Sequence, residues 1–154
     1  MKPLLPSLLT LSLLLLTFPL FGQETGVLYQ YETSSGLIFK SFGDGKVQPK
    51  YKGEIKNEKP NGFGFQTYKN GNKYFGEHKN GLPNCKGTET SPDGWRYVGK
   101  YNEGKKHGQG KFTYTDGGWY DGSWKEGQSW TGITYDKDGN ISYEKVNGEI
   151  QYKQ

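Results

Sequence analysis

The sequence contains a single cysteine, a single methionine and no alanine among its 154 residues. The single cysteine, Cys85, excludes a disulfide bond within the chain, although it could pair between molecules or simply be a tolerated small residue. Beyond residue 22, only twelve Val, Ile and Leu residues remain, too few for a deep aliphatic core. The chain has only two histidines, His78 and His107, so it has few residues from which to form a metal site or a catalytic triad.

Aromatic residues and glycine are abundant instead. The chain has twelve Tyr, eight Phe, four Trp and 24 Gly. Rings with an apolar face and a polar edge suit a thin, partly hydrated layer, and glycine favours turns over helices. The net charge of +4 is small because acidic and basic residues are interleaved, so we expect no nucleic-acid partner.

The first 22 residues have the features of a secretory signal peptide. Lys2 precedes an apolar run over residues 4–21, and Gly22 is a small residue suited to cleavage. The alternative is a retained membrane anchor, but the run is short for a bilayer span and Pro6 and Pro19 interrupt it. No cysteine lies near the cleavage region, so the sequence does not support a lipid anchor there. We therefore expect export to the periplasm, the outer envelope or the extracellular space.

A period of 23 residues runs through the rest of the chain. It is marked by tyrosines, each of the first four followed two residues later by a glycine. The tyrosines are Tyr51, Tyr74, Tyr97, Tyr120 and Tyr143, and the glycines are Gly53, Gly76, Gly99 and Gly122. Each unit ends near an Asx-Gly pair, which favours a tight hairpin turn, and in the fourth unit this pair comes one residue early. Each unit therefore predicts two strands and two turns.

This pattern resembles the MORN repeat. The third unit carries the whole pattern from Tyr97 to Gly110, including Lys105 and His107, while Glu58 and Cys85 replace glycines in the first two units. The fourth unit drifts after Gly127. The repeat-defining glycines are Gly53, Gly76, Gly99, Gly122, Gly62, Gly64, Gly108 and Gly110.

The resemblance implies an all-β fold, in which stacked antiparallel hairpins form a meander and one elongated, curved, single-layer sheet. We divide the chain into a signal peptide at 1–22, a degenerate N-terminal capping hairpin at 23–50, four repeats at 51–142 and a C-terminal capping hairpin at 143–154. Atypical ends are what a linear array needs to cover its terminal repeats.

Two segments and one pair of residues resemble catalytic or ligand-binding motifs only superficially. The segment 99–106 approaches a phosphate-binding loop, but Lys106 stands where Ser or Thr belongs, so we interpret its glycines as turn glycines. The segment 136–144 resembles part of a calcium loop but lacks two essential oxygen ligands, which favours a hairpin turn. Glu54 and Glu77 share a repeat phase, about 9.5 Å apart across two strands, yet nothing else supports a glycosidase.

Stacked hairpins present each repeat position as a column. One column contains Tyr51, Tyr74, Tyr97, Tyr120 and Tyr143. A second, four residues later on the same face, contains Ile55, His78, Tyr101 and Trp124. Either these rings pack the sheet together, or some remain exposed as a groove for a peptide or glycan.

The sequence thus predicts a non-catalytic protein without a cofactor or a metal. By resemblance, it is a structural or protein–protein interaction module, with self-association possible. The alternatives are a module for acidic phospholipid surfaces and a binder of cell-wall glycan. MORN repeats also occur in plant phosphatidylinositol-phosphate kinases, but no segment here corresponds to a kinase catalytic domain, so we expect no phosphoryl transfer.

Overall fold

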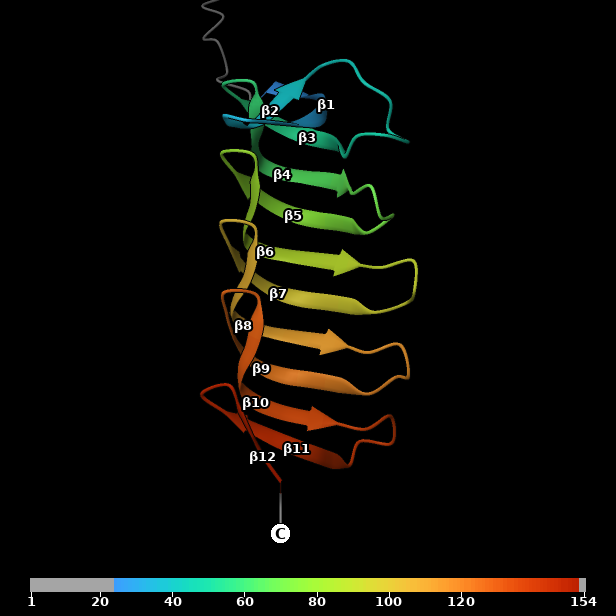
Figure 1. Cartoon of the computed structure of the whole chain (residues 1–154), viewed down its shortest axis with the longest axis vertical. Coiled ribbons are helices and arrows are strands. Elements are labelled where there is room, and N and C mark those ends of the chain that lie inside the picture. Colours follow the sequence, from blue (N-terminus) through green and yellow to red (C-terminus); the bar gives the residue numbers. More distant parts are fainter. Residues whose placement is uncertain (1–23, 153–154) are drawn as a thin grey trace, which may run out of the picture.

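The computed structural model describes residues 24–152, so the expected signal peptide and its cleavage site lie outside the described part of the chain. Twelve strands form a single antiparallel sheet, extended along the axis on which the hairpins stack (Figure 1). The first six strands are β1 (Glu24–Thr33), β2 (Gly36–Lys40), β3 (Lys50–Lys56), β4 (Lys59–Thr67), β5 (Lys73–Lys79) and β6 (Leu82–Thr90). The last six are β7 (Arg96–Asn102), β8 (Lys105–Thr113), β9 (Trp119–Lys125), β10 (Gln128–Tyr135), β11 (Ile141–Val146) and β12 (Glu149–Gln151).

The sheet is a meander from β3 to β12, as the repeat pattern predicts, but its N-terminal end departs from sequential order. The strand order ends β4-β3-β1-β2, so that β1 rather than β2 pairs with β3. Leu28 of β1 lies opposite Tyr51 and is buried, and it covers the first repeat. The longer strand β1 is therefore the one that caps the array, and β2 forms the outer edge.

Two sets of turns lie on opposite sides of the array, as Figure 1 shows. The two-residue turns within each repeat have positive φ at both residues, as in Asn80 (52°) and Gly81 (93°). This is the backbone of a type I′ turn, whose twist matches that of the flanking strands. The Asx-Gly pairs at the ends of the units, where the sequence predicts tight turns, lie instead in longer turns between repeats. In the turn at 68–72, the Tyr68 amide donates to the Asn72 carbonyl and only Gly71 has a positive φ.

Every repeat hairpin contains a bulge beside its glycine pair. In the first repeat Gly53 pairs with Gly64 and Ile55 with Pro60, so Glu54 alone faces residues 61–63. In the fourth repeat only Trp130 is extra, between Ser129 and Thr131. The residue missing from the fourth repeat is therefore missing from the bulge, and the hairpin itself remains intact.

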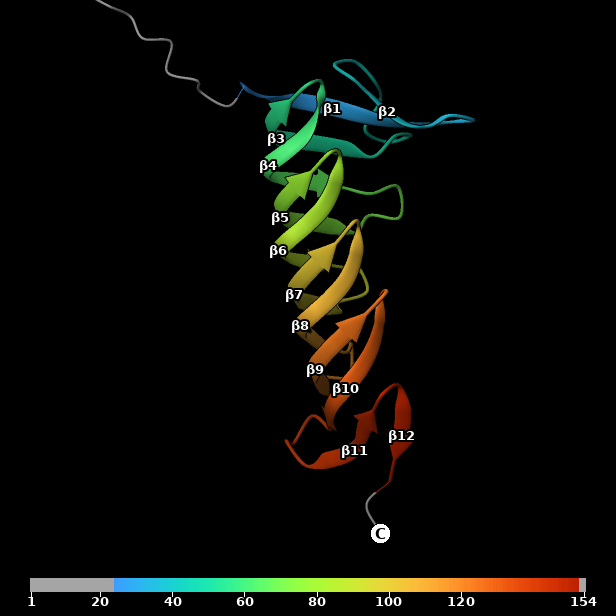
Figure 2. The same cartoon turned by 90° about the vertical axis from the view of Figure 1, so that its left-hand side faces the viewer.

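Among residues 24–152, no helix is long and apolar enough to cross a membrane. Figure 2 shows the strands of the repeats bending as they cross the array.

Candidate interaction surface

The fifth tyrosine of the first column, Tyr143, is only half-buried. The other four, Tyr51, Tyr74, Tyr97 and Tyr120, form the tyrosine column in the interior of the protein. Each of these side chains is at most 2 % exposed. Each hydroxyl donates to the carbonyl three residues later, at or next to the bulge; the acceptor is Lys100 for Tyr97, at 2.9 Å. Burial raises the pKa of Tyr51 to about 12, with a further contribution from Glu54, so that the hydroxyl stays a donor at physiological pH. These tyrosines pack the sheet and donate hydrogen bonds to backbone carbonyls at or next to the bulge. Their buried rings offer no surface for a ligand.

The glycines beside these tyrosines lie within strands. Nine of them pair across neighbouring strands in one continuous row: Gly26, Gly53, Gly64, Gly76, Gly87, Gly99, Gly110, Gly122 and Gly132. A Cβ at Gly110 would stand 2.6 Å from Tyr97 Cζ, well inside van der Waals contact. The interpretation of Gly99 as a turn glycine is therefore wrong, although it holds for Gly104 (φ 81°). Eight of these positions are glycine because a tyrosine side chain lies directly on each of them, whereas at Gly26 the nearby side chain is Ile55.

A smaller set of repeat glycines serves the bulge. Gly62 and Gly108 have φ of 104° and 63°, in the left-handed region where a Cβ is unfavourable. Cys85 occupies the equivalent position of the second repeat with φ 55°, and its side chain is exposed. His107, which the family pattern places at a turn, lies inside β8 beside this bulge.

The rings of the second column, His78, Tyr101 and Trp124, pack edge to face between successive tyrosines of the first column. The Tyr101 ring lies 5.0 Å from that of Tyr74 and 5.2 Å from that of Tyr97, nearly perpendicular to both. Trp124 does the same between Tyr97 and Tyr120, and its indole N–H donates to the Gly110 carbonyl. Perpendicular contacts of this kind add stabilisation beyond buried area. His78, Tyr101 and Trp124 are buried, and Ile55 is half-buried.

Glu89 and Lys106 form a charged pair beside this column. Lys106 Nζ lies 3.6 Å from a Glu89 oxygen and 4.7 Å from the centre of the Trp95 ring, with the Tyr97, Phe112 and Trp124 rings also around it. Burial lowers the pKa of Lys106, and Glu89 partly opposes that effect. Glu89 also accepts from the Tyr101 hydroxyl at 3.0 Å. Both charged groups therefore have partners within the chain, and the Lys106 ammonium lies among aromatic rings of the same chain.

The His78 ring lies between the rings of Tyr51 and Tyr74. Its Nε2 is 3.3 Å from Gln66 Oε1, and its Nδ1 is 3.2 Å from the Gly76 carbonyl. Burial lowers its pKa from 6.5 to about 4, although hydrogen bonds to the Gly76 and Gly62 carbonyls oppose that shift. The imidazole is therefore neutral in the folded protein at neutral pH.

This burial predicts acid sensitivity. Between pH 6.5 and 4 the unfolded chain binds a proton at His78 that the folded chain does not, so the stability falls as the pH drops through this window. The expected loss is about 3 kcal/mol, from about 1.4 kcal/mol per pKa unit. His78→Tyr, which copies Tyr101 of the next repeat, should remove most of this dependence in urea melts at stepped pH. His107→Gln serves as the matched control, and an unchanged slope in His78→Tyr would contradict the assignment.

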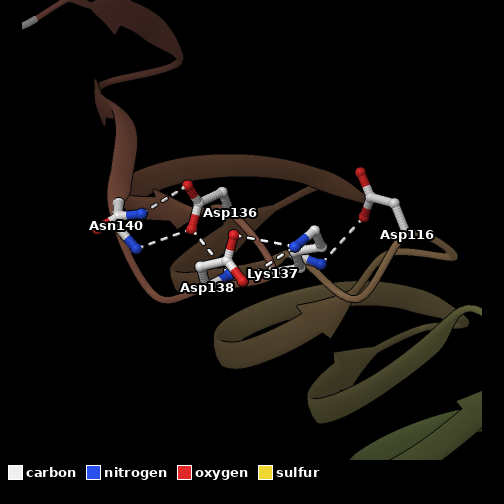
Figure 3. A network of polar contacts seen from close by, with 6 residues as sticks. Asp116, Asp136, Lys137, Asp138 and Asn140 are labelled. Carbon is white, nitrogen blue, oxygen red and sulfur yellow. Dashed lines mark hydrogen bonds and ion pairs between the residues drawn. The ribbon is translucent and has the colours of Figure 1, made fainter.

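The acidic segment after β10 is a closed turn, as predicted. In Figure 3 the Asp136 carboxylate accepts from the backbone amides of Asp138 and Asn140, at 3.0 and 2.8 Å, and from the Asn140 side chain. These bonds, those from Asn140 first, lower the pKa of Asp136. Lys137 forms an ion pair with the neighbouring Asp138. In the described part of the chain, no group of three or more His, Cys, Asp or Glu residues could hold a metal ion.

The face opposite the tyrosines carries the exposed apolar side chains of the central repeats. Phe63 is 53 % exposed, Phe65 42 %, Phe75 58 % and Val98 39 %, and we call these four residues the outer stripe. Phe65 pairs directly with Phe75, while Thr88 lies between Phe75 and Val98 on the next strands. Two shallow hollows of about 460 and 520 Å³ lie along the stripe. Contiguous exposed apolar surface of this kind marks interaction sites.

The outer stripe is absent from the residues that the sequence singled out. Its signal is strand alternation, since the residue after each repeat tyrosine must point to the opposite face. That residue is Phe75 in the second repeat and Val98 in the third, but Lys52 in the first and Asp121 in the fourth. Among the residues that follow a repeat tyrosine, only those of the second and third repeats are therefore apolar.

An open antiparallel sheet built from repeated hairpins, with a buried column of tyrosine rings, defines a β-repeat protein. A family model for the MORN repeat matches residues 51–73, 74–96, 97–119 and 120–130, more than half of the chain. The chain belongs to the MORN repeat family. No curated protein matches it in a sequence comparison.

Proposed function

We propose that this protein is an exported, non-catalytic interaction module that holds a protein partner against its outer stripe. The supporting observation is the exposure of Phe63, Phe65, Phe75 and Val98 on one face, over adjacent strands. These four residues are among the eleven large hydrophobic residues that are exposed in the described part of the chain. Burial of the outer stripe against a partner would remove apolar surface from water, which favours binding through the hydrophobic effect.

The packing of the other face supports this choice of surface. The tyrosine and second columns are buried, and their polar atoms bond within the sheet. A partner there would have to displace rings that hold neighbouring repeats together. The outer stripe, in contrast, is open without any rearrangement, as a preformed interface requires.

The stripe predicts a specific loss of binding. Phe65→Ser with Phe75→Ser removes two adjacent rings while leaving the buried columns untouched. A photo-crosslinker at Thr88, which lies between Phe75 and Val98, should capture an envelope protein with the natural chain and at least tenfold less with the double variant.

The matched control is Val146→Ser with Ile150→Ser, which removes exposed apolar side chains from the C-terminal hairpin. It should capture as much as the natural chain, and near-UV circular dichroism should show all three proteins folded. Equal capture by the Phe65/Phe75 variant would contradict the proposed surface. N-terminal sequencing of the purified protein tests export, since an intact Met1 would overturn that part.

A further inference from the structure

The two hollows of the outer face are the same site in successive repeats. One is lined by Phe75, Lys86, Thr88 and Val98, and the other by residues 23 positions earlier, Lys52, Phe63, Phe65 and Phe75. Phe63 and Phe75 line both hollows, which makes them continuous. They are therefore two equivalent compartments of one groove that crosses the strands along the array axis.

The groove is basic as well as apolar. The charged residues that line the two hollows are Lys52, Lys86 and Lys100. Lys86 and Lys100 lie directly opposite each other on β6 and β7, and both are exposed. Neither forms an ion pair with the nearby Glu77 or with any other residue of the described chain. Like charges directly opposite destabilise a sheet, and an acidic ligand group between them would reverse that effect.

The spacing of the compartments restricts the shape of the ligand. One repeat advances two strands, or about 9.5 Å. An extended strand places side chains on one face about every 6.7 Å, and an α-helix advances 5.4 Å per turn with a diameter of about 10 Å. A polyproline II segment advances about 9.3 Å in three residues, which brings every third side chain back to the same edge. Only the last period fits the repeat closely.

From this spacing and charge we infer that the groove binds an acidic, polyproline II-type segment of the partner, with an apolar residue at every third position. Successive apolar side chains enter the two compartments against Phe63, Phe75 and Val98, and a carboxylate lies between Lys86 and Lys100. This inference rests on the proposed function, because it names the class of partner segment that the outer stripe would hold.

The test uses labelled synthetic peptides and the full-length protein in fluorescence anisotropy. The probe is three repeats of Pro-Glu-Leu, and the comparison peptides are a same-composition peptide with leucine at every second position and three repeats of Pro-Lys-Leu. We expect the probe to bind at least tenfold more tightly than either. Lys86→Glu with Lys100→Glu should weaken the probe at least tenfold and should bind the Pro-Lys-Leu peptide instead. Lys46→Glu with Lys137→Glu, the same change in net charge elsewhere on the surface, should have no effect.

Three results would overturn the inference. They are equal binding of the two leucine spacings, an unchanged affinity in the Lys86/Lys100 variant, and binding of phosphatidylserine vesicles through these lysines without peptide binding. The last result would assign the groove to an anionic lipid surface, and its sensitivity to salt would verify that. Capture that depends on Phe65 and Phe75 without peptide binding would leave the proposed function standing and reject only the inference.

Discussion

Gly110→Ala is expected to destabilise the protein by about 3 kcal/mol or more, a large effect for one methyl group. The added Cβ would stand 2.6 Å from Tyr97 Cζ and equally close to Cε2 of the same ring. Tyr97 is fully buried between Tyr101 and Trp124, so its ring has nowhere to move. Urea denaturation followed by tryptophan fluorescence measures the loss.

Two comparisons isolate the cause of this loss. Gly45→Ala adds the same methyl group where the nearest atom is 3.5 Å away, and it should be neutral or stabilise by up to about 1 kcal/mol. In a Tyr97→Ala background, Gly110→Ala should be far less damaging, because the clashing ring is gone. Full additivity of the two substitutions would show that the glycine is required for the backbone rather than for the ring.

Tyr97→Ala should destabilise the protein by about 3–5 kcal/mol, as truncation of a large buried ring does. It removes the edge contacts to Tyr101 and Trp124 and leaves a cavity in the middle of the array. Because each repeat contacts only its neighbours, losing a central ring separates the two halves of the array. Thermal melts should therefore become broader as well as lower.

Tyr97→Phe separates the hydroxyl from the ring. It leaves the packing but removes the 2.9 Å hydrogen bond to the Lys100 carbonyl, so we expect a loss of about 1–3 kcal/mol. Tyr152→Ala, at an exposed tyrosine near the end of the chain, is the control and should change little. A Tyr97→Phe protein as stable as the natural one would mean that the bulge carbonyl does not need this donor.

The repeat pattern does not predict the outer stripe, because the residues of the stripe occupy positions that differ from one repeat to the next. The pattern is carried by residues that every repeat needs, namely the tyrosine and its glycines, and these lie on the packed face. The outer stripe occupies positions that vary between repeats, from Lys52 to Phe75 to Asp121. Variable positions give no periodic signal, so only the strand pairing shows that Phe65, Phe75 and Val98 lie in one line.

The sequence by itself determined the repeat length, the all-β fold, the hairpin turns and the membership of the tyrosine column. These follow from local chemistry, because Asx-Gly pairs favour hairpin turns and a fixed period places equal residues in register. Tertiary structure decided the order of β1 and β2, the placement of glycines beneath the tyrosine rings, and the face on which apolar side chains stay exposed. Those features depend on contacts between strands far apart in sequence, such as Gly99 with Gly110 beneath Tyr97.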